Sequence, residues 1–316
     1  MNKKKKISFQ GMGLWIAFVV LCVILAFANP YFLTWDNMMT VLRQAAYVAV
    51  VACGMTFVIA MGGIDLSVGA VMAIAGVIVG TLMVNGVNIY LAILIAMLAG
   101  ALIGSCSGVF VAHLGIPDFI VTMAMMSIIR GAVQVITKGI PTYGLVYPEF
   151  AFIAQGMILG IPFPIILTII VFAIFYYVLY HTRFGRYVIS TGSNMESARL
   201  VGIPIKKIKI SVYALCGFLA AFAGVIMTSR LTAAMPDAGQ NYEMDAIAAT
   251  VIGGTSMSGG KAKLLGTVLG AVMMAVVRNG LNLLAVNTYW HQVVIGAIVL
   301  LAVGTDIFSN RANKAK

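Results

Sequence analysis

Few side chains in this sequence are suited to covalent chemistry, and those few stand far apart. The three histidines, His113, His181 and His291, are scattered, and we find no paired carboxylates and no nucleophile beside a base. The four cysteines stand singly in apolar runs, without the spacing of a metal or redox site, at Cys22, Cys53, Cys106 and Cys216. We therefore predict no catalytic residues, no metal site and no cofactor, and we interpret the cysteines as small core residues.

A nucleotide-binding loop is also missing, although one stretch comes close to its pattern. Such a loop requires Gly-x-x-x-x-Gly-Lys-Ser/Thr, in which backbone amides hold phosphate and the hydroxyl binds magnesium. The near match ends at Gly260 and Lys261, but Thr255 replaces the first glycine and Ala262 replaces the hydroxyl residue. Any ATP hydrolysis linked to this protein is therefore expected on another chain.

Six polar side chains interrupt otherwise apolar stretches: Arg130, Gln134, Arg278, Asn279, Asn282 and Gln292. Burying an unpaired polar group costs free energy, so we expect these side chains to face the protein interior or one another. Asn279 and Asn282 are candidate pathway groups for a neutral polyol, because amides both donate and accept hydrogen bonds. The alternative is that they join neighbouring helices. For Arg278 we favour snorkelling to water at the membrane surface.

Two glycine-rich stretches share the pattern Gly-Gly-x-x-x-Ser-x-Gly, one over residues 62–69 and the other over 253–260. Helix breaks at corresponding places in two halves indicate a transport pathway, because the exposed backbone groups must line a cavity. We therefore predict an internal repeat, parallel or inverted, with Gly-broken helices. Alternatively, the glycines only permit tight turns or close helix packing. The candidate pathway residues here are Gly62, Gly63, Asp65, Ser67, Gly69, Gly253, Gly254 and Ser258.

Asp65 is the only acidic residue of the first glycine-rich stretch. An ionisable group near a membrane is a functional candidate. It can equally cap the following helix, where a carboxylate accepts hydrogen bonds from free amides. We favour the capping role.

The composition is that of an integral membrane protein. Of 316 residues, 62% are hydrophobic and 9% are charged, whereas soluble domains have roughly 45–50% apolar and about 25% charged residues. A membrane helix needs about 20 mainly apolar residues, and the long non-alternating runs exclude a barrel. We predict an all-α, polytopic transmembrane bundle forming one domain over residues 1–316. The ten expected segments are 12–28, 45–61, 68–84, 89–112, 118–137, 161–180, 210–229, 246–260, 264–284 and 290–305.

The charges predict which side of the membrane each loop faces. With the N-terminus inside, most of the 20 Lys and Arg residues fall in inside loops, as the positive-inside rule requires. Both termini are then cytoplasmic, and the basic excess reflects topology rather than a nucleic-acid partner. The first segment also resembles a secretory signal ending at residues 26–28, but we favour an uncleaved span. The acidic residues expected in outside loops are Asp36, Glu149, Asp237, Glu243 and Asp245.

The longest inside loop, residues 181–209, contains a short polar helix followed by Gly202 and Pro204. Glycine can end a helix and proline prevents its continuation, so this segment is predicted to form a rigid knob. Such a knob suits docking to a soluble partner. The alternative is an ordinary solvated loop stabilised by its charges.

The chain is identified here as resembling the permease subunits of ABC importers, in particular the ribose-type sugar permeases. The spacing of Glu196, Ser197, Ala198 and Gly202 resembles their Glu-Ala-Ala-x-x-x-Gly coupling motif, with Ser197 where alanine is usual. Residues 182–187 resemble the segment that precedes this motif in that family. The stretches 63–69, 242–256 and 279–284 are similar to further family motifs in the same order, so the resemblance covers nearly the whole chain.

The resemblance implies a homodimeric permease subunit in the bacterial plasma (inner) membrane that translocates a monosaccharide, with ribose as the first guess. It implies docking of a cytoplasmic ATP-binding subunit through Glu196, Ser197, Ala198, Gly202 and Pro204, and delivery of sugar by an extracytoplasmic binding protein. The alternatives are an ion-coupled secondary transporter, an intramembrane enzyme, or an importer of nucleosides or branched-chain amino acids. The placement of most acids in predicted loops argues against the first, and absent catalytic groups argue against the second.

Overall fold

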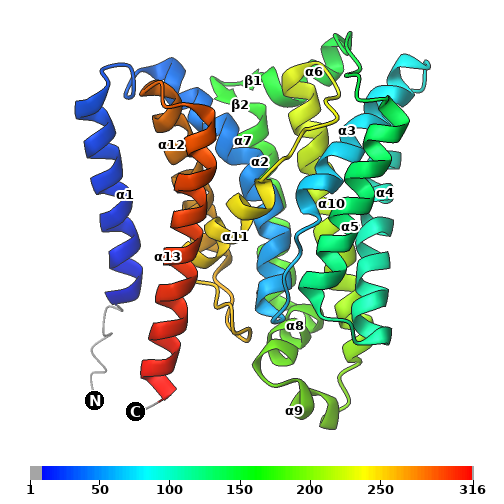
Figure 1. Cartoon of the computed structure of the whole chain (residues 1–316), viewed down its shortest axis with the longest axis vertical. Coiled ribbons are helices and arrows are strands. Elements are labelled where there is room, and N and C mark those ends of the chain that lie inside the picture. The colour runs from blue at the N-terminus through cyan, green and yellow to red at the C-terminus, as the bar shows by residue number, and fades with distance from the viewer. Residues whose placement is uncertain (1–8, 315–316) are drawn as a thin grey trace.

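The computed structural model describes residues 9–314, and it is helical almost throughout (Figure 1). A π-helical turn, η1 (Phe110–Leu114), extends α4, and two short strands, β1 (Met157–Ile158) and β2 (Ile161–Pro162), pair in an antiparallel hairpin. The helices are α1 (Phe9–Ala28), α2 (Trp35–Ala60), α3 (Val68–Val84), α4 (Ile89–Val109), α5 (Asp118–Thr137), α6 (Pro148–Gln155), α7 (Phe163–His181), α8 (Arg183–Ser193), α9 (Met195–Leu200), α10 (Ile205–Leu231), α11 (Tyr242–Ile252), α12 (Leu264–Leu283) and α13 (Thr288–Lys314).

The predicted all-α polytopic membrane fold is confirmed. Among the described residues, 7 helices are long and apolar enough to cross a bilayer: α2, α4 with η1, α5, α7, α10, α12 and α13. Shorter apolar helices are formed by Trp15–Ala28 of α1 and by α3. The helix α2 begins at Trp35, ten residues earlier than expected; its first two residues are exposed, and Met39 and Val41 are its first buried residues.

Two of the predicted spans are broken helices, in which a non-helical segment leads into a short helix; residues 236–241 of the second segment form turns. From the foot of α2 the chain climbs through non-helical residues 62–67 before α3 begins inside the bundle, and from the top of α10 it descends through residues 232–241 to α11 (Figure 1). Each non-helical segment and the short helix after it together make one pass. With α1 and the seven long helices, the described residues make ten passes, the number expected.

The eighth predicted span, 246–260, is wrong in its extent. The helix α11 has 11 residues and ends at Ile252. Beyond it, Gly254, Gly259 and Gly260 have φ angles of +92°, +75° and +74°, a backbone region that glycine enters without steric cost. These glycines turn the chain into a loop at the lower end of the bundle instead of extending the helix.

An internal repeat is visible in the order of the elements. In both halves a long helix is followed by a non-helical segment, a short helix and two long helices, over α2–α5 and over α10–α13. Since α2 descends in Figure 1 and α10 ascends, the two halves are inverted. The Gly-Gly-x-x-x-Ser-x-Gly pattern does not mark equivalent places in them, because residues 62–69 precede α3 whereas residues 253–260 follow α11. The predicted repeat is therefore present in the order of the helices, but the two glycine-rich stretches are not its equivalent positions.

The ends of the described chain lie on the same side of the bundle. In Figure 1 the start of α1, the end of α13, the helices α8 and α9, and the loop before α12 all lie at the lower end. The hairpin and α6 lie at the opposite end. The basic inside segments predicted from the charges therefore share one end, apart from Lys3 to Lys6 and Lys316, which lie outside the described residues.

Glycines allow α4 and α10 to approach backbone to backbone. A Cβ on Gly100 would overlap the carbonyl oxygen of Gly217, and one on Gly104 would overlap that of Tyr213. On the same face of α4, a Cβ on Gly108 would lie 2.7 Å from the Cα atom of Ile210. Small residues four apart are typical of tightly packed membrane helices, because lipid supplies no hydrophobic force between them.

Replacing Gly104 with alanine is expected to lower the apparent melting temperature of the detergent-solubilised protein. Its Cβ would meet the rigid backbone of α10, and overpacking of this kind costs about 1–3 kcal/mol. Gly131→Ala is the matched control, because a Cβ there meets no atom within 4 Å. Thermal unfolding followed by circular dichroism measures both; equal melting temperatures for the two variants would contradict the packing argument.

Candidate functional site

The two broken helices meet inside the bundle through a pair of glycines. A Cβ on Gly69, in the first turn of α3, would overlap the carbonyl oxygen of Gly239 and lie 2.5 Å from the Glu243 carboxylate. Gly239, with φ of +67°, faces the Gly69 carbonyl in return. Gly69 is thus the predicted pathway residue that lies where the two broken helices meet. Gly239 was not among the sequence candidates, since a single glycine in a loop carries no pattern.

Two carboxylates lie in the first turn of α11 and are buried. Glu243 is 8% exposed and Asp245 is 0% exposed, so their assignment to an outside loop was wrong. The positive end of a helix dipole favours acids in the first turn, and the sequence analysis took α11 to start after them. With these acids inside, the argument against ion coupling from acids confined to loops no longer holds.

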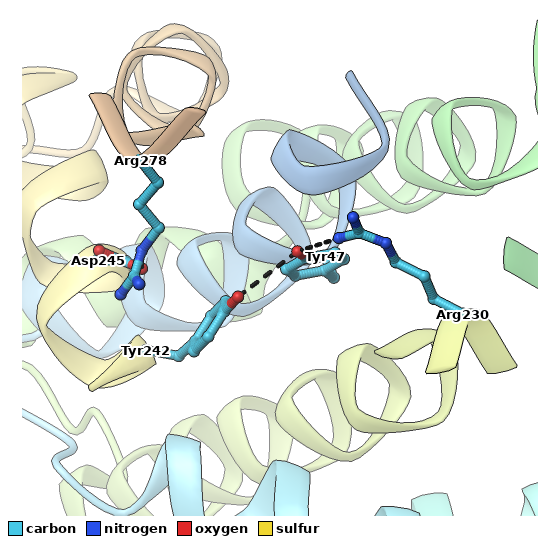
Figure 2. Close-up of polar contacts among 5 residues, drawn as sticks. All are labelled: Tyr47, Arg230, Tyr242, Asp245 and Arg278. Carbon is cyan, nitrogen blue, oxygen red and sulfur yellow. Dashed lines mark hydrogen bonds and ion pairs between the residues drawn. The ribbon is translucent and has the colours of Figure 1, made fainter. Parts of the chain in front are cut away.

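Arg278 pairs with Asp245 instead of snorkelling to water. Its Nε lies 2.6 Å from an Asp245 carboxylate oxygen, and its guanidinium carbon lies 5.0 Å from the ring centre of Tyr242 (Figure 2). The other carboxylate oxygen, Oδ1, and the guanidinium nitrogen Nη2 are buried without a hydrogen-bond partner in the described part of the chain. The pair therefore joins α12 to α11 and still leaves one acceptor and one donor unused.

Two tyrosines continue this polar network across the bundle. The hydroxyl of Tyr242 lies 3.5 Å from that of Tyr47 on α2, and Arg230 of α10 donates from Nη1 to the Tyr47 hydroxyl at 2.7 Å (Figure 2). The two rings are tilted, with centres 5.7 Å apart. We call Tyr47, Arg230, Tyr242, Asp245 and Arg278 the tyrosine–arginine network. Arg278 alone was singled out for its polarity inside a span, and the other four were missed as candidate site residues.

Asn279 belongs to an interhelical contact. Its side-chain amide and that of Asn37 on α2 donate to each other at 2.7 and 3.0 Å. The two amides satisfy each other, so the interhelical alternative describes this residue. Asn282 is exposed one turn further along α12, and the structure does not place it beside the network.

The first glycine-rich stretch is held between α5 and α10. The Tyr213 hydroxyl donates to an Asp118 carboxylate oxygen at 2.8 Å and lies 3.4 Å from the carbonyl of Ile64. A Cβ on Gly63 would collide with the Asp118 carboxylate. This close fit explains how an extended strand of chain is tolerated inside a membrane bundle, where its polar groups need protein partners.

Asp65 organises the start of α3 without capping its amides. It is 1% exposed, and its Oδ1 accepts hydrogen bonds from the backbone nitrogen and the hydroxyl of Ser67 at 2.9 and 2.6 Å. Ser67 is the residue before the helix, so the bonds close a turn just outside it. The capping prediction is therefore wrong: the Asp65 side chain closes a turn that precedes α3.

The second glycine-rich stretch lies at the lower end and makes turns and packing contacts. A Cβ on Gly253 would overlap the backbone of Gly266, which explains how α11 and α12 approach each other. Gly254 takes its positive φ in the turn after α11, and the Ser258 backbone nitrogen donates to the Ser256 hydroxyl at 3.3 Å. At Gly62, with φ of +91°, a Cβ would meet open space, so this residue also serves a turn.

The predicted knob is formed by α8 and α9. Asn194 starts α9 by accepting a hydrogen bond from the Ser197 backbone nitrogen at 2.9 Å, and Gly202, with φ of +80°, ends it before Pro204 and α10. Ala198 is buried beneath the knob. At its tip Leu200 is 87% exposed and Val201 is 76% exposed. The tip is therefore an apolar surface, flanked by the charges of Glu196 and Arg199.

Backbone contacts join the knob to the end of α2 and to the loop between α11 and α12. A Cβ on Gly192, near the end of α8, would overlap the Ala60 carbonyl oxygen at the end of α2, and the Gly260 backbone nitrogen donates to that same oxygen at 2.9 Å. Gly259 also packs against Gly192. We call Ala60, Gly192, Gly259 and Gly260 the glycine joint. It touches the chain just before the extended entry to α3 and the loop just after α11.

Comparisons with known proteins identify relatives along almost the whole chain. The family model described as branched-chain amino acid transport system / permease component matches residues 37–303. The chain is 44% identical over 294 residues to the ribose import permease protein of Haemophilus influenzae, covering 92% of this chain and 91% of that protein. It is 41% identical to the ribose import permease protein of Bacillus subtilis, covering 96% of each. It is 37% identical to the D-allose transport system permease protein of Escherichia coli, with 96% and 95% covered. No solved structure matches it.

Proposed function

Because this chain belongs to the family of branched-chain amino acid transport system permease components, we propose that it is the membrane subunit of an ATP-driven importer of ribose or a related monosaccharide. The observation that carries the proposal is the identity of 41–44% to ribose import permeases over more than nine-tenths of the chain. The resemblance to ribose-type permeases recognised from the motifs is thereby confirmed. Within this family, import of nucleosides or branched-chain amino acids is the alternative.

The knob is the proposed contact with a cytoplasmic ATP-binding subunit. Its exposed apolar tip supports this role, since apolar residues ringed by polar groups are typical of docking sites. Glu196, Ser197, Ala198, Gly202 and Pro204 would then shape or line the contact, as expected from the coupling motif. In the bacterial plasma membrane, the end of the bundle that holds α8 and α9 would face the cytoplasm. Both ends of the described chain would then be cytoplasmic as well.

The extracytoplasmic sugar-binding protein is proposed to dock at the opposite end, which carries α6 and the β1–β2 hairpin (Figure 1). A second copy of the chain is expected to complete the translocation unit in the membrane. Sugar would pass the interior where Gly69 and Gly239 bring the broken helices together. Broken helices support this placement, because irregular backbone at membrane depth is tolerated beside a pathway.

Movement of the knob is the proposed source of alternating access. When the ATP-binding subunits close on ATP, the docked α8 and α9 are displaced, and the glycine joint passes that displacement to α2 and to the loop after α11. The two broken helices then reorient, and the pathway opens to the other side. The chain itself carries out no covalent step in this scheme, and ATP is hydrolysed by its partner.

Uptake by reconstituted vesicles tests the function. The permease is purified with its ATP-binding subunit, placed in proteoliposomes with ATP inside, and supplied with loaded binding protein outside. We expect ATP-dependent accumulation of labelled ribose or a related monosaccharide, and none of uridine or leucine. Accumulation by the permease alone under an ion gradient would favour the secondary-transporter alternative, and uptake of uridine or leucine would overturn the sugar assignment.

A further inference from the structure

We propose that the tyrosine–arginine network is a sugar-contact site inside the pathway, at which Tyr47, Tyr242, Asp245 and Arg278 hold a neutral polyhydroxylated ring during passage. This inference rests on the proposed function and names the side chains that would meet the substrate. Arg43 lies one turn before Tyr47 on α2, and Glu243 lies between Tyr242 and Asp245 in the first turn of α11.

Unused hydrogen-bonding atoms occur on the helices that carry the network. Within the described residues, buried side-chain atoms without a partner occur at six places. Two of them belong to the network itself, Asp245 Oδ1 and Arg278 Nη2, and two more lie on the same helices α2 and α11, Arg43 Nε and Glu243 Oε2. Buried polar groups are normally satisfied, so each such atom calls for an explanation. The four are two donors and two acceptors, and a sugar hydroxyl can donate and accept at once.

The charges of these groups nearly balance, three arginines against two acids. A phosphate or carboxylate would be attracted by Arg43, Arg230 and Arg278 but repelled by Glu243 and Asp245, and a cation would meet the opposite forces, so neither kind of simple ion is strongly favoured. A hydroxyl group, by contrast, donates to the carboxylates and accepts from the guanidinium groups. The mixture of charges therefore fits a sugar better than an ion.

The tyrosines supply the apolar part of a sugar site. A sugar ring has apolar C–H faces and a polar rim, and a tyrosine has an apolar ring with a polar tip. In this conformation the guanidinium carbons of Arg278 and Arg230 lie 5.0 and 5.8 Å from the ring centres of Tyr242 and Tyr47. Asp245 and Arg278 already bond to each other, so a sugar can bond only to the carboxylate oxygen and the guanidinium nitrogen that remain without a partner. With so few bonds, binding stays weak enough for release.

The test is sugar selectivity at saturating binding protein, measured as initial uptake rates in proteoliposomes. The variants are Tyr47→Phe and Tyr242→Phe, which keep the ring and lose only the hydroxyl. The substrates are ribose and deoxy sugars that the unaltered transporter carries. Tyr213→Phe is the matched control, since Tyr213 is a fully buried tyrosine bonded to Asp118 outside the network.

We expect Tyr242→Phe to change the rate ratio of ribose to one deoxy sugar by about 3- to 10-fold, the loss of one hydrogen bond. The ratio should stay constant in Tyr213→Phe, and ATP-binding subunit should copurify with all variants. Equal slowing of every sugar, or unchanged rates, would overturn the sugar contact, as would inhibition by ribose 5-phosphate stronger than by ribose. Absence of sugar uptake by the unaltered transporter would instead refute the proposed function.

Discussion

Replacing Gly192 with alanine is expected to reduce ATP-driven sugar uptake by about tenfold or more, because overpacking against a rigid backbone costs about 1–3 kcal/mol in one conformation of a moving joint. The new Cβ would overlap the Ala60 carbonyl oxygen and crowd the Gly260 amide. The knob would be pushed away from the end of α2, while its exposed tip is unaltered. Uptake should therefore fall although the ATP-binding subunit stays bound and hydrolyses ATP.

Uptake, ATPase activity and copurification are measured together for this variant. Gly131→Ala is the control, because a Cβ at Gly131 would meet no atom within 4 Å. Gly260→Ala should reproduce the defect from the other side of the glycine joint, since its Cβ would lie 2.7 Å from the Cα atom of Ser193. Uptake at the unaltered rate in both joint variants would contradict transmission through these contacts. Loss of the ATP-binding subunit would assign Gly192 to docking instead.

Replacing Leu200 with glutamate is expected to release the ATP-binding subunit and to abolish uptake. A residue that is 87% exposed at the tip of a knob is a suitable anchor for a pocket in a partner, and loss of such an anchor weakens binding by about 30-fold or more, equal to about 2 kcal/mol. A charge at this position would have to be buried in the contact. The permease itself should still insert and fold, because Leu200 makes no core contact.

Copurification of the ATP-binding subunit on the tagged permease measures this loss directly. Leu159→Glu is the matched control, since Leu159 is 97% exposed in the turn between β1 and β2 at the opposite end of the bundle. An undiminished yield of the ATP-binding subunit with Leu200→Glu would contradict the assignment of the knob to the docking surface. A loss that occurs equally with Leu159→Glu would point to a general defect in folding.

The number and order of the membrane passes were predictable from the sequence, but the start of α2 and the extent of the eighth pass were wrong. Apolar length, glycine turns and charge bias predicted ten passes, and the knob followed from Gly202 and Pro204. The eighth pass was misplaced because apolar residues continue past Ile252, while Gly253 and Gly254 bend the backbone there. The acids Glu243 and Asp245 were assigned to a loop because they precede the apolar run. A short polar stretch before such a run looks the same in sequence whether it is a loop or the first turn of a buried helix.

The composition by itself determined that this protein is a helical membrane protein, because lipid requires every spanning segment to be long, apolar and internally hydrogen-bonded. The ribose-type permease family was indicated by the resemblance of the motifs. Only the tertiary structure decided which polar groups meet. Tyr47 contacts Arg230 and Tyr242 across 183 and 195 residues of sequence, and Asn279 is paired with Asn37. Such contacts depend on the depth and rotation of each packed helix, and local hydrophobicity does not encode either of them.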